Sequence, residues 1–531
     1  MSRPLALALC GLLVAAPAAA RERQVTPYIE ASQVLTADLS GNGDVLTYTS
    51  LAAGVDASIT SRRVELQASY RYEYRFGWDR PRQEDSVHSG LARAAVTLGR
   101  GLQIEGGALA TRARSDVRGA APGAFGIDQP NLSQVFAAYV GPTLATRAGP
   151  VTVNAAYRFG YVKVESPDQP GLLPGASPLD YYDDSTSHMA MASASVRAGE
   201  ILPIGLTVSG AWNRENVSQL DQRYDGKFAR VDAVLPVTPA LAVTAGAGYE
   251  EIEISQRDAL LTPAGQPAVD GNGRFVTDPA SPRRIAYETD GLFWDAGVIW
   301  RPSRRTTLTA RVGRRYESTT YLGSLSYQID EGSGFQVGVY DSVQSFGRGL
   351  NNALATLPTA FNTRPDPFGD QFGGCVFGSR GDNAGACLNP ILGAVSTSQF
   401  RSRGVDAVYS ANAGPYRFGV GAGYTNRAFL VPRRAQGFGL DNVSDAIWYG
   451  QLFAGRSLSP RSSVDANAFI NYFDSGVAGT PDVLGGGATG SYSYSFGRFG
   501  ATASVGVYAF DQGAAETDVS AQGLVGMRYS F

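Results

Sequence analysis

The stretch that decides the fold is the C-terminal one, Leu524-Val525-Gly526-Met527-Arg528-Tyr529-Ser530-Phe531. In a β-strand, successive side chains point to opposite faces. Val525, Met527, Tyr529 and Phe531 therefore share one apolar and aromatic face, while the residues between them form a small or polar face. This alternation predicts a strand that meets lipid on one side and water on the other.

The N-terminus predicts export from the cytoplasm. Arg3 supplies a short positive region, residues 5–16 are apolar, and the small residues 18–20 resemble a cleavage site. We therefore expect residues 1–20 to be a signal peptide and residues 21–531 to be the mature chain. Mean hydropathy is -0.12, and beyond the signal no stretch reaches the ~18 apolar residues of a spanning helix.

The same alternation recurs along the mature chain. In residues 64–76, Tyr70, Tyr72, Tyr74 and Phe76 alternate with charged and polar residues, a period of two that no helix can hold. Similar runs occupy residues 151–161, 292–300, 416–424 and 499–507. With 64 glycines, 26 tyrosines and 24 phenylalanines, the composition also favours strands. The fold class predicted is all-β, a transmembrane antiparallel outer-membrane β-barrel.

The connections alternate between tight turns and longer polar loops, as in barrels with short periplasmic turns and long outer loops. Counting strands between them gives about 22, and we expect 18–22. The longest outer loop is expected at residues 346–397. Strand signal begins by Tyr28, so the barrel is expected to have no plug domain. In this setting Tyr529 and Phe531 resemble the assembly signal that the barrel assembly machinery recognises.

Charged residues on the polar faces are the candidate lumen lining. If the aromatic stripe meets lipid, arginines and acids point inward together, and the arginines are more numerous. Two interpretations stay open: cross-strand ion ladders that stabilise a wet interior, or guanidinium groups that attract anionic solutes. The charge-selective candidates are Arg71, Arg75, Arg93, Arg158, Arg230, Arg311, Arg315 and Arg417.

Other site chemistry is sparse. Cys375 and Cys387, in the longest loop, are expected to form a disulfide in an oxidising compartment. His88 and His188 lack the partner arrangement of a hydrolase, so we expect no enzyme, no catalytic residue, no metal and no cofactor. Without residues 1–20 the chain carries 44 basic and 48 acidic residues, and this near-neutral balance argues against a nucleic-acid partner.

The start of the mature chain resembles a known family. Val25-Thr26-Pro27-Tyr28-Ile29, Asp44-Val45-Leu46-Thr47 and Gln67-Ala68-Ser69-Tyr70-Arg71-Tyr72 are similar to the opening of the porin-like outer-membrane barrels of exopolysaccharide and exosortase (PEP-CTERM) loci. The resemblance implies a channel that exports a polysaccharide, anionic in our interpretation, together with periplasmic export proteins in a Gram-negative outer membrane. The alternative is a non-conducting structural or adhesive barrel that acts through its long extracellular loops.

Overall fold

A computed structural model describes residues 22–40, 45–78, 84–115, 132–165, 180–363, 368, 372–432, 443–477, 479–513 and 517–531. The expected signal peptide, residues 1–20, lies outside this range. In the described part, 22 antiparallel strands pair in chain order, and β1 pairs with β24 to close the ring. The predictions of an all-β fold and of about 22 strands are confirmed.

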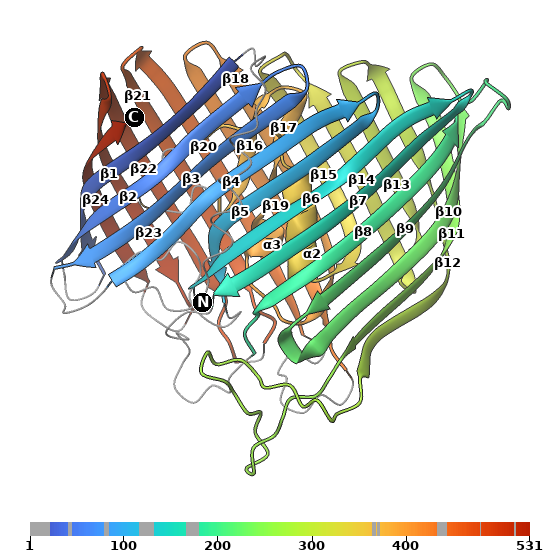
Figure 1. The fold of residues 1–531 in the computed structure, drawn as a ribbon, viewed down its shortest axis with the longest axis horizontal. Coiled ribbons are helices and arrows are strands. Elements are labelled where there is room, and N and C mark those ends of the chain that lie inside the picture. Colours follow the sequence, from blue (N-terminus) through green and yellow to red (C-terminus); the bar gives the residue numbers. More distant parts are fainter. Residues whose placement is uncertain are drawn as a thin grey trace.

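The ring strands follow the chain without a crossover (Figure 1). Their bounds are β1 Glu22–Asp38, β2 Val45–Thr60, β3 Val64–Gly77, β4 Glu84–Gly99, β5 Leu102–Arg114, β6 Leu132–Ala148, β7 Val151–Glu165, β8 Asp184–Val196, β9 Gly205–Val217, β10 Gln222–Pro236, β11 Leu241–Gln256, β12 Arg284–Ser303, β13 Thr306–Arg315, β14 Ser318–Gln328, β15 Ser333–Gln344, β18 Gln399–Ala413, β19 Tyr416–Leu430, β20 Ser444–Ser459, β21 Ser462–Asp474, β22 Val483–Phe496, β23 Phe499–Asp511 and β24 Asp518–Ser530.

The two faces of the strands differ as the alternation predicts. On β3, Tyr70 and Tyr72 are more than one-third exposed, whereas Arg71 and Glu73 are less than one-tenth exposed. Val525 and Met527 on β24 are 68% and 52% exposed. The apolar face therefore points out of the ring and the charged face points into it. In the described residues, no helix is long and apolar enough to cross a membrane.

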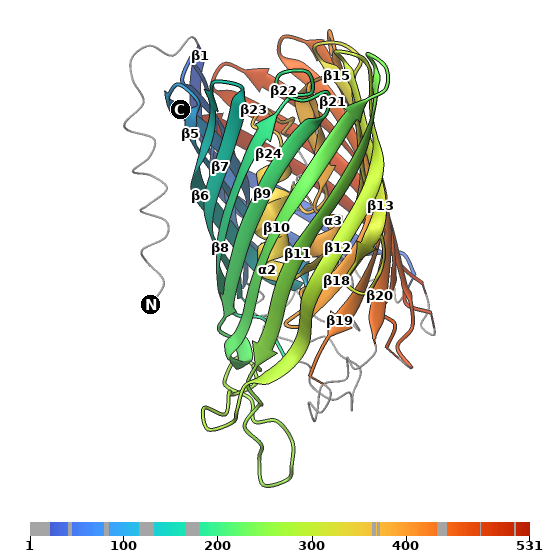
Figure 2. The ribbon, with the colours of Figure 1, turned by 90° about the vertical axis from the view of Figure 1, so that its right-hand side faces the viewer.

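The two rims of the ring differ in the length of their connections. One rim, called the turn rim below, carries tight turns such as residues 61–63, 414–415 and 497–498. The opposite loop rim carries longer connections, and residues 257–283 project beyond it in Figure 2. This alternation of short and long connections matches the prediction. On the loop rim, the connection between β9 and β10 is short and consists of little more than the 3-10 helix η1 (Gln219–Asp221).

The connection from β15 to β18, residues 345–398, does not form an outer loop. It contains α2 (Phe346–Thr356), the hairpin β16 (Cys375–Arg380) and β17 (Asn383–Cys387), and α3 (Asn389–Leu392), and both helices lie inside the ring in Figures 1 and 2. The prediction of an outer loop at 346–397 is wrong. This internal segment occupies part of the lumen, and the absence of a separate plug domain stays a prediction.

Burial of apolar side chains explains why the internal segment folds inward. Phe346, Leu350 and Leu354 recur every four residues on one face of α2, and none of the three is exposed. Ser345 caps the helix by accepting a hydrogen bond from the backbone N–H of Arg348. The buried face joins a cluster with Val135, Val162 and other wall residues. In an outer loop the same side chains would face water.

Candidate functional site

Two of the predicted lumen arginines hold α2 against the wall. Arg93 on β4 donates hydrogen bonds to the carbonyls of Ala355 (3.1 Å) and Leu357 (3.2 Å) at the C-terminal end of the helix. A cation is favoured there because the helix dipole leaves that end partly negative. Arg158 on β7 donates to Asn352 (3.3 Å). These two side chains therefore serve the internal segment, and neither projects freely into a channel.

The hairpin β16–β17 packs on the other side of the ring. Cys375 and Cys387 form a disulfide between its strands. The backbone N–H of Cys375 donates to the side-chain oxygen of Gln451 on β20 (2.6 Å), and the ring of Phe377 stacks on Phe453 at 6.4 Å. Gly421 on β19 faces the disulfide so closely that an added Cβ would lie 2.3 Å from the sulfur of Cys375.

A fully buried ion pair fastens the end of the internal segment. Arg427 on β19 and Asp445 on β20 are both 0% exposed, and Arg427 also donates to the carbonyl of Ala394 (2.8 Å). Removing one partner of such a pair leaves an uncompensated buried charge, which typically costs about 3–5 kcal/mol. The segment is thus tied to β4 and β7 on one side and to β19 and β20 on the other.

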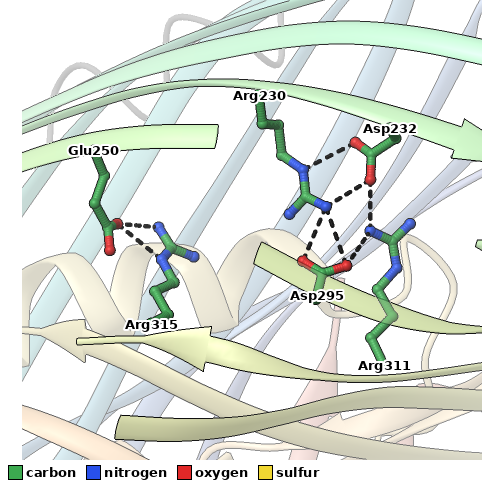
Figure 3. Close-up of polar contacts among 6 residues, drawn as sticks. All are labelled: Arg230, Asp232, Glu250, Asp295, Arg311 and Arg315. Carbon is green, nitrogen blue, oxygen red and sulfur yellow. Dashed lines mark hydrogen bonds and ion pairs between the residues drawn. The ribbon is translucent and has the colours of Figure 1, made fainter. Parts of the chain in front are cut away.

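A network of four charged side chains lies on a different part of the wall, on β10, β12 and β13 (Figure 3). Arg230 bonds Asp232 through Nε (2.9 Å) and Asp295 through Nη2 (3.0 Å). Arg311 reaches Asp232 (2.8 Å) and Asp295 (3.3 Å) through Nη1. Each guanidinium therefore bridges two carboxylates, and each carboxylate meets two guanidiniums.

Glycines let these long side chains lie along the wall. An added Cβ at Gly246 would come within 2.2 Å of Nη2 of Arg230, and one at Gly313 would come within 2.7 Å of Cβ of Asp295. Both positions neighbour the network across the strands. The guanidiniums consequently lie along the inner surface of the barrel.

A second pair extends the charged wall. Arg315 on β13 bonds Glu250 on β11 (2.7 Å), as Figure 3 also shows. The guanidinium lies 4.9 Å from the ring centre of Phe293, a favourable cation–π arrangement. We call the six residues of Figure 3 the charged wall: Arg230, Asp232, Glu250, Asp295, Arg311 and Arg315. It holds three positive and three negative side chains.

The remaining predicted arginines are also paired with acids. Arg71 bonds Glu30 (2.9 Å) and Arg75 bonds Glu73 (2.9 Å), while Arg417 bonds Asp465 (2.7 Å). The structure therefore places all eight predicted arginines inside the ring, six of them in ion pairs and two against α2. This arrangement matches the cross-strand ladder interpretation more closely than a set of free cations.

The chain end lies at the turn rim. Tyr529 contacts the rings of Phe499 and Phe531, each at 5.0 Å, and the N–H of Phe531 donates to the carbonyl of Pro27 (3.0 Å). Both residues thus join the seam that closes the barrel. Their expected part in assembly stays a prediction.

The histidines lie on the outer face of the barrel. His88 receives or donates a hydrogen bond with the Tyr70 hydroxyl (2.6 Å), and His188 does the same with Tyr157 (2.7 Å). Both imidazoles are surrounded by aromatic rings. Among the described residues, no group of three or more His, Cys, Asp or Glu side chains could hold a metal ion.

Sequence reasoning missed the internal segment and the residues that fix it. Ser345 followed by apolar residues at 346, 350 and 354 is a capped amphipathic helix signal that could have revealed α2. The pairing of Arg427 with Asp445 depends on which strand neighbours which, and no local pattern encodes it.

Comparison with known proteins gives distant similarities. No protein-family model matches the chain, and no curated protein matches it. Among solved structures, the FrpB iron transporter from Neisseria meningitidis is 11% identical, with TM-score 0.43 over 95% of this chain and 82% of that one. The ferric-catecholate import receptor Fiu from E. coli K12 is 11% identical, with TM-score 0.42 over 95% and 81%. OccAB4 from Acinetobacter baumannii is 8% identical, with TM-score 0.30 over 96% and 98%. All three TM-scores lie below 0.5, and the fold described above rests on the strand pairing of this chain.

Proposed function

We propose that the protein is a channel of the Gram-negative outer membrane, narrowed by its own internal segment. The outward face supports a membrane setting because it exposes large apolar side chains all around the ring, such as Leu292 (85%), Val505 (68%) and Trp294 (55%). Apolar area of this extent is unfavourable in water and suits lipid. The turn rim then faces the periplasm and the loop rim faces outward.

The charged wall is the observation that carries the channel proposal. The internal segment is fastened to β4, β7, β9, β19 and β20, and it reaches β10 where Arg348 lies over the ring of Tyr224. The charged wall lies further along β10 and on β11–β13. Its guanidiniums keep some exposure, with 28% for the side chain of Arg311 and 21% for that of Arg315. In contrast, the pair that anchors the segment has none. We therefore propose that hydrated solutes pass along the charged wall, beside the internal segment.

Equal numbers of both charges make the expected selectivity weak. Three carboxylates neutralise three guanidiniums on the charged wall, so an anion gains little there over a cation. A polar solute can still exchange hydrogen bonds with both signs of charge as it passes. Export of a polysaccharide stays a proposal that rests on the family resemblance of the N-terminal strands.

Ion selectivity in planar bilayers tests this route. The double variant Asp232→Asn plus Asp295→Asn leaves the three arginines with one acid, so reversal potentials should shift toward anions. The shift should shrink at high salt, since the screening length falls from about 10 Å at 0.1 M to about 3 Å at 1 M. Glu251→Gln is the matched control, because Glu251 is 50% exposed beside Lys227 on the outer face. A shift no larger than that of the control would contradict the route.

The second candidate function is a non-conducting barrel that acts through its outer loops. It is favoured by the loop of residues 257–283, which projects beyond the loop rim in Figure 2 and exposes Leu260, Leu261 and Val269 by 45–49%. Deleting residues 260–276 would separate the two functions. A channel keeps its conductance without them, whereas a loop-mediated adhesive barrel loses cell-surface binding.

A further inference from the structure

A cavity of about 310 Å³ opens inside the ring near the turn rim, away from the charged wall. β1, β3 and β22–β24 build it, and it lies where the first and last strands close the barrel. Its polar lining includes Tyr28, Glu30, Arg71, Ser493, Thr502 and Arg528. The volume is at the lower end of the roughly 300–1,000 Å³ of small-molecule sites, so it suits one unit of a small solute.

Part of the cavity is empty because one of its lining residues, Gly500, has no side chain. Gly500 pairs with Arg528 across β23 and β24, and the nearest atoms to an added Cβ there are 3.9–4.0 Å away. The position has no positive φ and no crowding backbone. A larger side chain at residue 500 would therefore enter the cavity without straining the strand.

Arg71 presents a donor that the protein leaves unused. Its side chain is only 10% exposed, and Nη2 bonds Glu30 (2.9 Å) and lies 3.4 Å from Glu73. Its Nε–H, however, is buried without a hydrogen-bond partner among the described residues. An unsatisfied buried donor is costly, and a charged one is more so. Because this atom has almost no accessible surface, a ligand oxygen in the cavity would reach it only after the Arg71 side chain shifts.

Arg528 supplies a second guanidinium beside the first. It bonds Asp56 through Nη2 (2.6 Å), and its guanidinium carbon lies 3.4 Å from the ring centre of Tyr28. Arg498 lines the same cavity. The lining itself holds three guanidiniums and one carboxylate, that of Glu30, while Glu73 and Asp56 bond Arg71 and Arg528 from beside it. The lining therefore offers more hydrogen-bond donors than acceptors, without a large excess of positive charge. Ser493 and Thr502, whose hydroxyls lie 3.4 Å apart, add neutral donors and acceptors.

We propose that this cavity binds the carboxylate of a polyhydroxylated solute, as in a sugar acid. Arg71 and Arg528 hold the carboxylate, since planar guanidiniums match its geometry. Ser493 and Thr502 exchange hydrogen bonds with hydroxyl groups on the neighbouring carbons. The site deepens the proposed channel function by naming a solute class at the periplasmic mouth, and its occupancy does not require conduction.

Calorimetry on the full-length protein in detergent tests the site with three defined probes: gluconate, sorbitol and acetate. Sorbitol keeps the hydroxyl chain without the carboxylate, and acetate keeps the carboxylate without the hydroxyl chain. We expect gluconate to bind at least about tenfold more tightly than either, because hydrogen bonds to charged groups are the strong ones. Equal binding of gluconate and sorbitol, or of gluconate and acetate, would overturn the proposed ligand class.

Two variants locate the binding. Arg71→Gln should weaken gluconate at least about tenfold, and Gly500→Leu should abolish binding by filling the cavity. Gly490→Leu is the matched control on the outer face of β22, where no atom lies within 4 Å of an added Cβ. If Arg71→Gln does not assemble, Gly500→Leu still decides the question. Unchanged binding in Gly500→Leu would remove the site, whereas binding without any conductance would leave it standing and refute the channel.

Discussion

Arg380, at the tip of the hairpin inside the barrel, forms an ion pair of 2.6 Å with Glu65 on β3. The next residue, Gly381, donates its N–H to the carbonyl of Glu331 in the turn between β14 and β15 (2.9 Å). At the opposite rim, Ser345 bonds the carboxylate of Glu215 on β9. The internal segment therefore runs the full height of the barrel and is fastened at both rims.

The ion pair at the hairpin tip should limit local opening of the hairpin and contribute little to the stability of the whole barrel. Arg380→Glu places two acids together, and hydrogen exchange in residues 375–387 should become up to about fivefold faster. An exposed pair is worth only about 0.2–1 kcal/mol, and the two side chains are 47% and 30% exposed. Mass spectrometry of the exchanged protein measures the effect.

A charge swap supplies the control for that variant. Arg380→Glu combined with Glu65→Arg recreates an ion pair of reversed direction, so exchange should return toward that of the unmodified protein. If the double variant exchanges as fast as Arg380→Glu alone, the pair does not fasten the hairpin.

Close packing between the disulfide and the wall predicts a sensitive position. Gly421→Val puts a Cβ 2.3 Å from the sulfur of Cys375 and 3.0 Å from that of Cys387, so the hairpin must move. Overpacking of this kind costs about 1–3 kcal/mol. The temperature at which the folded band disappears on unboiled gels should fall. Gly490→Val, where no atom lies within 4 Å of the added Cβ, should leave it unchanged, and equal temperatures for both variants would contradict the packing.

Acidity should strengthen the contact between two outer loops. Burial raises the pKa of Asp180 to about 7, although the N–H of Phe275, the Gln219 amide, the Tyr181 N–H and Arg274 each oppose the shift. Because its folded pKa lies above the unfolded value of 3.8, the folded state binds more protons between about pH 4 and 7. Stability of this contact therefore falls as pH rises through that window and stays low above it.

Amide exchange at Phe275 reports this change, because its N–H donates to Asp180 (2.8 Å). After correction for intrinsic exchange rates, protection should be higher at pH 5 than at pH 8. Asp180→Asn cannot ionise and should remove the dependence. The same pH profile in both proteins would assign the effect to another group.

Much of the fold could be predicted because alternation is local. Tyr72 and Arg71 differ in burial as a period of two requires, and the turns fix the number of strands. The course of residues 345–398 could not be predicted in this way, since a polar loop with glycines resembles any outer loop. Apolar residues such as Phe346 and Leu350 in that loop were the available sign of an interior position.

The candidate site was harder to predict from the sequence than the fold. Arginines on the inner face were predictable, but their partners depend on strand register. Arg230, for example, meets Asp295 across two strands, and the pair is 65 residues apart along the chain. Charge balance on the charged wall therefore emerged only with the strands in place.

Neighbouring residues on β13 should differ in access to water. Arg311 belongs to the charged wall on the inner face, where it pairs with Asp232, whereas Val312 is 47% exposed on the outer face. A cysteine at residue 311 should react with a membrane-impermeant maleimide in intact cells, and one at residue 312 should stay unlabelled in lipid. Equal labelling would show that the strand faces are wrongly assigned.

Single-channel conductance of two proteins, the full chain and a form with residues 346–397 replaced by a short Gly-Ser linker, tests the central claim most directly. Heat-modifiable migration on gels first establishes that both have assembled. We expect a small conductance for the full chain and a conductance several times larger without the internal segment, because the segment fills part of a 22-stranded ring. Equal conductance in the two proteins, or none in either, would contradict it.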